Sequence, residues 1–164
     1  MAHARFTITG DVQRVGRMLN QVKSNYNIIG NEIVDSNAEI YYEALISNIE
    51  SQKIQWKPLN PEYKERKGLL GLDTRILIAT GEYLSNVQIR SIYKTGKATR
   101  HVGVDSRTIH SQSKLKMSDL AIIQEYGSSD GRIPARGHYS KTWEQVRDKI
   151  RLNTLSKARS MIRR

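Results

Sequence analysis

The chain has 164 residues, of which 38% are apolar, and this suffices for one buried core and therefore for a single domain. It has no cysteines, which excludes disulfides, thiol catalysis and cysteine-based metal sites, and no apolar run approaches the roughly 20 residues that cross a bilayer. A net charge of +11 favours an anionic partner, and without a signal-like N-terminus we expect a soluble protein that is not secreted.

The first 55 residues predict a short strand followed by a helical arm. Residues 6–9 alternate apolar and polar side chains and end at Gly10, which is typical of a strand and a turn. Asp11 is a suitable N-cap for the segment that follows. Over residues 12–33 apolar side chains recur every three or four positions, which predicts an amphipathic helix.

A second apolar series at residues 34–49 continues this spacing on a rotated face. A weak run at residues 25–31, rich in asparagine and glycine, favours a break between two helices. Strict heptads fail at Ser36 and Glu43, so the apolar stripe favours packing onto a sheet or a neighbouring subunit over a coiled coil.

A loop and a short helix follow the arm. Pro58 lacks the amide donor that a helix needs, so residues 56–59 are expected to form a loop. Asn60 then caps a short helix that has Pro61 at its first position and is stopped by Gly68.

The centre of the chain predicts a small sheet. The compact apolar run at residues 75–80 favours a buried strand, and the glycine after it permits a sharp turn. Residues 87–93 predict the next strand, and a hairpin turn at residues 94–97 leads into residues 99–104. The sheet is therefore expected to be at least partly antiparallel.

The last third of the chain predicts a polar loop and two helices. Residues 105–116 have no apolar period, and we expect a loop that is mobile or becomes ordered on assembly. Ser118 is expected to cap a helix that Gly127 ends, and a final helix is expected to start near Ser140.

Together the pattern predicts an α+β fold, with N-terminal amphipathic helices packed against a small, mainly antiparallel sheet, short helices and a C-terminal helix. No repeat or linker divides the chain. We expect a single domain over 1–164, in which residues 1–55 form the N-terminal strand and helical arm. Residues 56–164 are expected to form a sheet-containing body with a basic C-terminal helix.

The positive charge belongs to the second half of the chain. Residues 1–80 hold 10 Lys and Arg against 9 Asp and Glu, whereas residues 81–164 hold 17 against 7. Such a distribution favours a DNA backbone or an acidic protein surface, and a solvated helix face that aids solubility is the alternative. The candidate residues are Lys141, Arg147, Lys149, Arg151, Lys157 and Arg159. Aromatic residues are sparse there, so sequence-independent contact with duplex DNA is favoured over base stacking.

No motif for catalysis, a cofactor or a metal is present in the sequence. The four histidines lack the spacing of zinc ligands, the glycines do not form a phosphate-binding loop, and there is no nucleophile elbow. The acids fall mostly on predicted helix surfaces. We therefore expect a protein that binds partners, with no small-molecule substrate, and not an enzyme.

Two segments carry a resemblance. The first contains WKPLNPEY at 56–63, Lys67 and ILIATGEYL at 76–84, and the second contains AIIQEYG at 121–127 and IPAR at 133–136. In this order they resemble the phage virion morphogenesis family of tail-completion, or head-tail joining, proteins. After Arg136 the family usually continues with proline and an apolar aromatic, and this chain departs from that pattern.

The resemblance implies candidate interface residues, which are the motif positions Trp56, Pro58, Leu59, Tyr63, Thr80, Gly81, Glu125, Tyr126, Gly127, Ile133, Pro134 and Arg136. For Trp56 the alternatives are packing in the core or a subunit interface, or direct contact with a partner. For Arg136 they are an ion-pair anchor across subunits or a satisfied surface arginine.

The resemblance also implies a function and a location. It indicates a structural virion protein of the phage neck, assembled in the host cytoplasm as a cyclic ring, with six-fold symmetry expected. The ring would complete the tail end or join the tail to the head. Its neighbours would be portal or adaptor proteins and tail-terminator or tail-tube proteins, and duplex DNA would pass through its lumen. A free, sequence-independent nucleic-acid-binding protein is the alternative.

Overall fold

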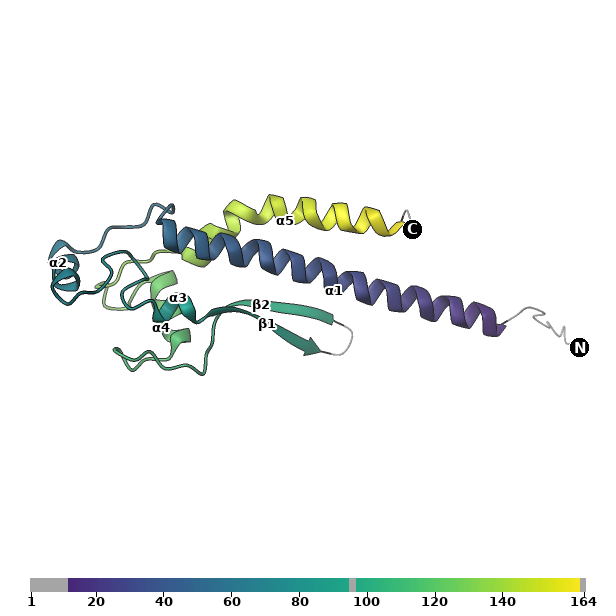
Figure 1. Ribbon diagram of the computed structural model, residues 1–164, viewed down its shortest axis with the longest axis horizontal. Coiled ribbons are helices and arrows are strands. Elements are labelled where there is room, and N and C mark those ends of the chain that lie inside the picture. The colour runs from purple at the N-terminus through teal and green to yellow at the C-terminus, as the bar shows by residue number, and fades with distance from the viewer. Residues whose placement is uncertain (1–11, 95–96, 163–164) are drawn as a thin grey trace, which may run out of the picture.

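A computed structural model describes residues 12–94 and 97–162 of the chain, and it confirms the α+β class (Figure 1). Two long helices lie side by side, a two-stranded hairpin lies on the other side of the first helix, and short helices gather at one end. The elements in chain order are α1 (Val12–Ser51), α2 (Pro61–Leu69), α3 (Glu82–Ser85), β1 (Val87–Lys94), β2 (Lys97–Val104), α4 (Met117–Tyr126) and α5 (His138–Ile162).

Helix α1 is one continuous helix of 40 residues, so the predicted break into two helices is wrong. The asparagine-rich run stays helical, with the Asn31 side chain donating a hydrogen bond to the Asn27 carbonyl oxygen one turn earlier, at 2.9 Å. Weak helix propensity was outweighed by continuity with the packed half of the helix. The strand expected at residues 6–9, the cap at Asp11 and the tip of the hairpin at 95–96 lie outside the described residues.

Helices α1 and α5 run antiparallel and are joined by polar side chains. The Asn48 amide donates to the Thr142 hydroxyl at 3.0 Å, and further along the pair the Asn37 amide donates to the Thr154 hydroxyl at 2.9 Å. Thr142 and Asn48 are buried, so this hydrogen bond fixes the register of two helices whose apolar faces alone would tolerate sliding.

The hairpin of β1 and β2 confirms the predicted antiparallel pair, with Val87 opposite Val104 and Ile92 opposite Thr99. It packs against the middle of α1 on the side away from α5 (Figure 1). Within the described residues it is the whole sheet.

The strand predicted at residues 75–80 is wrong, because this segment forms turns. The backbone groups of Ile76 are satisfied by a side chain instead of a neighbouring strand: the Gln52 amide accepts from the Ile76 N–H and donates to the Ile76 carbonyl oxygen, both at 3.0 Å. Leu77 then adopts a φ of 68°, which a strand does not contain. Ile78 is nevertheless buried in the core, whereas Ile76, Leu77 and Ala79 are half-buried, so the expected burial holds fully for Ile78 alone.

The helix ends agree in part with the predictions. Asn60 caps α2 as expected, accepting from the Glu62 N–H at 2.9 Å, although the helix passes through Gly68 to Leu69. Helix α4 starts at Met117, so Ser118 lies inside it and its hydroxyl donates to Asp119. Helix α3 was not predicted, and α5 starts two residues before Ser140.

The polar loop at residues 105–116 is held by hydrogen bonds. The His110 N–H donates to the Leu115 carbonyl oxygen at 2.8 Å, and the Ser111 N–H donates to the Glu82 carboxylate at 2.9 Å. Its expected ordering on assembly stays a prediction.

The core sits at the C-terminal half of α1, where the short helices and the hairpin meet. Its buried residues are Leu45, Ile49, Ile78, Tyr83, Val87, Met117 and Ala121. None of the helices in the described part of the chain combines the length and apolar character needed to cross a membrane.

Candidate functional site

The N-terminal part of α1 projects beyond both the hairpin and the end of α5 (Figure 1). Residues 12–28 of this helix span about 25 Å at the rise of an α-helix; we call them the arm. One face of the arm carries an apolar stripe with side chains that are 50% to 65% exposed, namely Val15, Met18, Leu19, Val22 and Tyr26. No element among the described residues covers this stripe.

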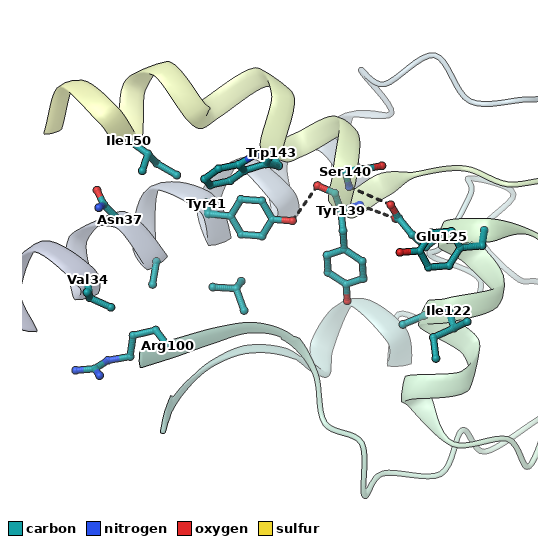
Figure 2. A pocket seen from close by; sticks show the side chains of 14 residues that line it. Val34, Asn37, Tyr41, Arg100, Ile122, Glu125, Tyr139, Ser140, Trp143 and Ile150 are labelled. Atoms are coloured by element: carbon teal, nitrogen blue, oxygen red, sulfur yellow. Dashed lines mark hydrogen bonds between the residues drawn. The ribbon is translucent and has the colours of Figure 1, made fainter. Parts of the chain in front are cut away.

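Farther along α1 the apolar spacing continues on a gradually rotated face and lines a groove in the body. The groove lies between α1 and α5 on one side and β2 and α4 on the other, and its volume is about 740 Å³. Figure 2 shows Trp143 and Tyr41 side by side on one wall, with Val34 and Ile150 at one end and Ile122 at the other.

The groove is open and mostly apolar. The Trp143 side chain is 50% exposed and its ring lies 6.4 Å from that of Tyr41, while the Tyr41 hydroxyl donates to the Tyr139 carbonyl oxygen at 2.9 Å. At the α4 end, Ile122 and Tyr126 are 57% and 77% exposed. Large apolar side chains on an open concave surface are typical of a protein interface.

The two family-like segments, although far apart in sequence, meet around a second cavity of about 750 Å³, which we call the motif pocket. It lies between α2, the turns at residues 76–80 and the loop that follows α4. The motif residues that line it are Pro58, Leu59, Tyr63, Thr80, Ile133, Pro134 and Arg136. The structure therefore brings together seven of the residues singled out from the sequence.

The remaining motif residues have other places. Trp56 packs against the core, as the first alternative predicted, with its indole N–H buried and unpartnered. Gly81 precedes α3 with a φ of 75°, in the left-handed region that favours glycine. Glu125 and Tyr126 line the apolar groove instead of the motif pocket.

Gly127 allows the two halves of the second segment, residues 121–127 and 133–136, to pack closely against one another. Its φ of 89° and ψ of 167° lie in a region that is essentially restricted to glycine, and an added Cβ would lie 3.0 Å from both Ile133 O and Ala135 N. This close approach lets the Arg136 N–H donate to the Gln124 carbonyl oxygen at 2.9 Å. The loop at 133–136 thus caps the end of α4.

Glu125 joins α4 to α5. Its carboxylate accepts from the Tyr139 N–H at 2.9 Å and the Ser140 N–H at 3.1 Å, where the amides at the start of α5 lack partners in their own helix. Burial alone would raise the pKa of Glu125, but the hydrogen bonds from Ser140 and Tyr139 outweigh it and the pKa is lowered.

His138 lies at the centre of a buried polar cluster that the sequence did not predict. Its Nε2 lies 2.7 Å from the Tyr83 hydroxyl, and its Nδ1 lies 3.3 Å from the Glu125 carboxylate without the alignment of a hydrogen bond. Burial lowers the pKa of His138 to about 4; Glu125 opposes this shift and Arg136 adds to it. The imidazole is therefore neutral at neutral pH.

This cluster resembles a proton relay in composition, but it lies in the packed interior. His138 has no exposed surface and Tyr83 is 7% exposed, so a substrate does not reach the imidazole in this structure. Its plainest role is to hold α3, α4 and α5 together. The only sequence signal was the departure from the family pattern directly after Arg136.

The basic residues of α5 do not form one continuous positive stripe. Their helical positions are spread around the axis, and Glu144 and Asp148 alternate with Arg147 and Arg151 on the exposed face. Lys141 donates to the Gln55 carbonyl oxygen at 3.1 Å, which ties α5 to the loop that follows α1. Exposed charges of both signs are also what a solvated face would carry.

Within residues 12–94 and 97–162, no group of three or more His, Asp or Glu side chains is placed to hold a metal ion. No family model, curated protein or solved structure matches the chain.

Proposed function

We propose that this chain is a structural subunit of a phage neck, which completes the tail end or joins it to the portal complex as a ring of identical copies. The resemblance of the two motif segments supports membership of the family. The uncovered apolar stripe on the arm is the main support for assembly into a ring. An exposed apolar helix face lowers the solubility of a protein unless another surface covers it.

The groove of a second copy of this chain is the surface that fits the stripe. A ring forms through heterologous contacts, in which one surface of a subunit meets a different surface of the next. The chain offers both halves of such a contact, because the stripe is convex and apolar and the groove beside Trp143 is concave and apolar. The arm is continuous with the helix that lines its own groove, so as a rigid helix it reaches only a neighbour's groove.

The expected strength of the contact favours a closed ring over a dimer. Five side chains that are about half exposed supply about 1 kcal/mol each when they are covered, or about 5 kcal/mol for the stripe. This only matches the lower bound for the cost of association, which is about 4 kcal/mol or more. In a closed ring each subunit makes two such contacts. The contact that closes the ring forms within one assembly, so it costs less translational and rotational entropy.

In this proposal the work of the protein is binding and no reaction is catalysed. Six copies surround the channel through which duplex DNA passes, and the neighbours are portal or adaptor proteins on the head side and tail-terminator or tail-tube proteins on the tail side. The basic residues of α5, with Arg147 and Arg151 exposed, meet either DNA or acidic neighbours.

Phage particles test the proposal. A phage that lacks this protein is expected to produce DNA-filled heads and separate tails, and microscopy of the intact neck is expected to reveal a ring of this subunit. Normally joined particles in its absence would contradict the proposal.

The alternative is a free protein that binds duplex DNA without regard to sequence, and the excess of 17 basic over 7 acidic residues in the second half favours it. It predicts tight binding by the isolated subunit with a steep dependence on salt. Binding to one duplex at two salt concentrations separates the two functions, because a ring subunit is expected to bind weakly when isolated.

A further inference from the structure

The motif pocket contains two cations that are buried without an acidic partner. The side chains of Lys67 and Arg136 both line the pocket, and the residues are only 4% and 5% exposed. Arg136 was expected either at a subunit ion pair or on the surface, and the second alternative is wrong. Among the described residues, neither cation forms an ion pair with a carboxylate.

Their existing hydrogen bonds go to neutral oxygens. The Lys67 Nζ donates to the Arg75 carbonyl oxygen at 2.8 Å, and the Arg136 Nη1 donates to the side-chain oxygen of Gln124. The Arg136 Nε–H is buried and has no acceptor. A buried guanidinium N–H without an acceptor is uncommon, because it loses water and gains nothing in return.

The two charges also disfavour one another. Burial lowers the pKa of Lys67, Asp73 raises it in part, and the charge of Arg136 lowers it further. Burial lowers the pKa of Arg136 as well. Buried charges in proteins are normally paired, and neither of these cations has an ion pair, although Glu62 also lines the pocket. An anion bound beside them would supply the missing partner.

The rest of the lining indicates which anion fits. Leu59, Leu77 and Pro134 form apolar walls, and the hydroxyls of Tyr63 and Thr80 add polar contacts. A guanidinium fork matches a planar carboxylate, and the apolar walls suit the side chains that flank it in a peptide. Duplex DNA is a convex rod that meets exposed cations, and its phosphates fit a walled pocket poorly.

We propose that the motif pocket receives a carboxylate carried by an extended segment of a partner protein, with Arg136 and Lys67 as the paired cations and the apolar walls around its neighbours. In the neck this segment would belong to an adjoining protein, and to that extent the proposal rests on the proposed function. The pocket itself exists in the single chain. Its binding chemistry can therefore fail, or hold, independently of ring assembly.

The experiment uses the full chain and small probes, observed by NMR at neutral pH and constant ionic strength. Hexanoate supplies a carboxylate with an apolar tail, and hexanamide is its neutral match. We expect hexanoate to shift the Arg136 Nε–H signal and the amides of Leu59, Thr80 and Ile133, and to bind about ten-fold more tightly than hexanamide, as a charge-assisted hydrogen bond implies.

Variants and competitors complete the test. Arg136→Gln is expected to remove the preference for hexanoate, whereas Arg132→Gln, at an exposed arginine on the rim of the same pocket, is expected to keep it. Should Arg136→Gln fail to fold, the comparison of the two probes on the native chain decides alone. Equal binding of hexanoate and hexanamide, no response of the pocket signals, or stronger binding of inorganic phosphate or a short DNA duplex would overturn the proposal.

Discussion

The two halves of α1 contrast within one helix. In the body, Leu45 is completely buried among the core residues, whereas in the arm Leu19 is 64% exposed although the apolar spacing around it is just as regular. Most of the stability of a helix in a protein comes from packing, and the arm is helical here as the extension of a packed helix. The difference teaches that an apolar period in the sequence predicts a surface that needs a partner, and does not say whether that partner lies in the same chain.

The largest effect is expected from the same substitution in the two halves. Leu45→Ala leaves a cavity in the core and is expected to lower the free energy of unfolding by about 2 to 5 kcal/mol. Leu19→Ala is expected to change it by no more than about 0.5 kcal/mol in the monomer, because the residue is 64% exposed and lies outside the core. Urea unfolding at low protein concentration measures both.

Similar losses from the two variants would mean that the arm folds back and packs on its own body. That result would remove the contrast on which the assembly proposal rests.

The second effect is a loss of stability of the body at acid pH. The pKa of His138 is about 4 in the folded chain and about 6.5 in the unfolded chain, so below about 6.5 the unfolded state binds the proton first. Stability is fully present above this pH and falls by about 3 kcal/mol as the pH approaches about 4. The lowered pKa of Glu125 acts in the same direction below its usual range.

Denaturant unfolding at several pH values between about 4 and about 6.5 measures how steeply the free energy of unfolding falls as the pH is lowered. His138→Gln is expected to flatten this slope, although the variant is less stable at neutral pH because Tyr83 loses its hydrogen bond with the imidazole. An unchanged slope in this variant would show that His138 does not carry the acid sensitivity.

The third effect compares two glycines. Gly127→Ala places a Cβ against the backbone of Ile133 and Ala135 at a φ of 89°, and is expected to lower the stability of the body by at least about 2 kcal/mol. Gly30→Ala, in α1 with open space around it, is expected to raise stability by up to about 1 kcal/mol. Thermal unfolding of the two variants gives opposite shifts, and equal shifts would contradict the described path of the loop after α4.

The sequence predicted elements whose determinants are local. The hairpin follows from alternation in two neighbouring runs, the start of α2 from Asn60 and Pro61, and the end of α4 from Gly127. In each case the stabilising contacts lie within a few residues, so the pattern contains enough information.

It failed where a distant side chain decided the outcome. Residues 75–80 have the composition of a strand, but Gln52, which lies 24 residues before Ile76, takes the place of a neighbouring strand. The cluster around His138 joins three helices and has no local signature. For the same reason the meeting of Lys67 and Arg136 in one pocket could not be read from their positions in the chain.

Measuring the mass of assemblies formed by the purified protein and two arm variants tests the central claim most directly. Val22→Glu places a charge on the apolar stripe, and Ser24→Glu places the same charge on the opposite face of the arm. We predict that the native chain and Ser24→Glu form closed oligomers at high concentration, whereas Val22→Glu stays monomeric. The same mass for Val22→Glu and the native chain would contradict the account.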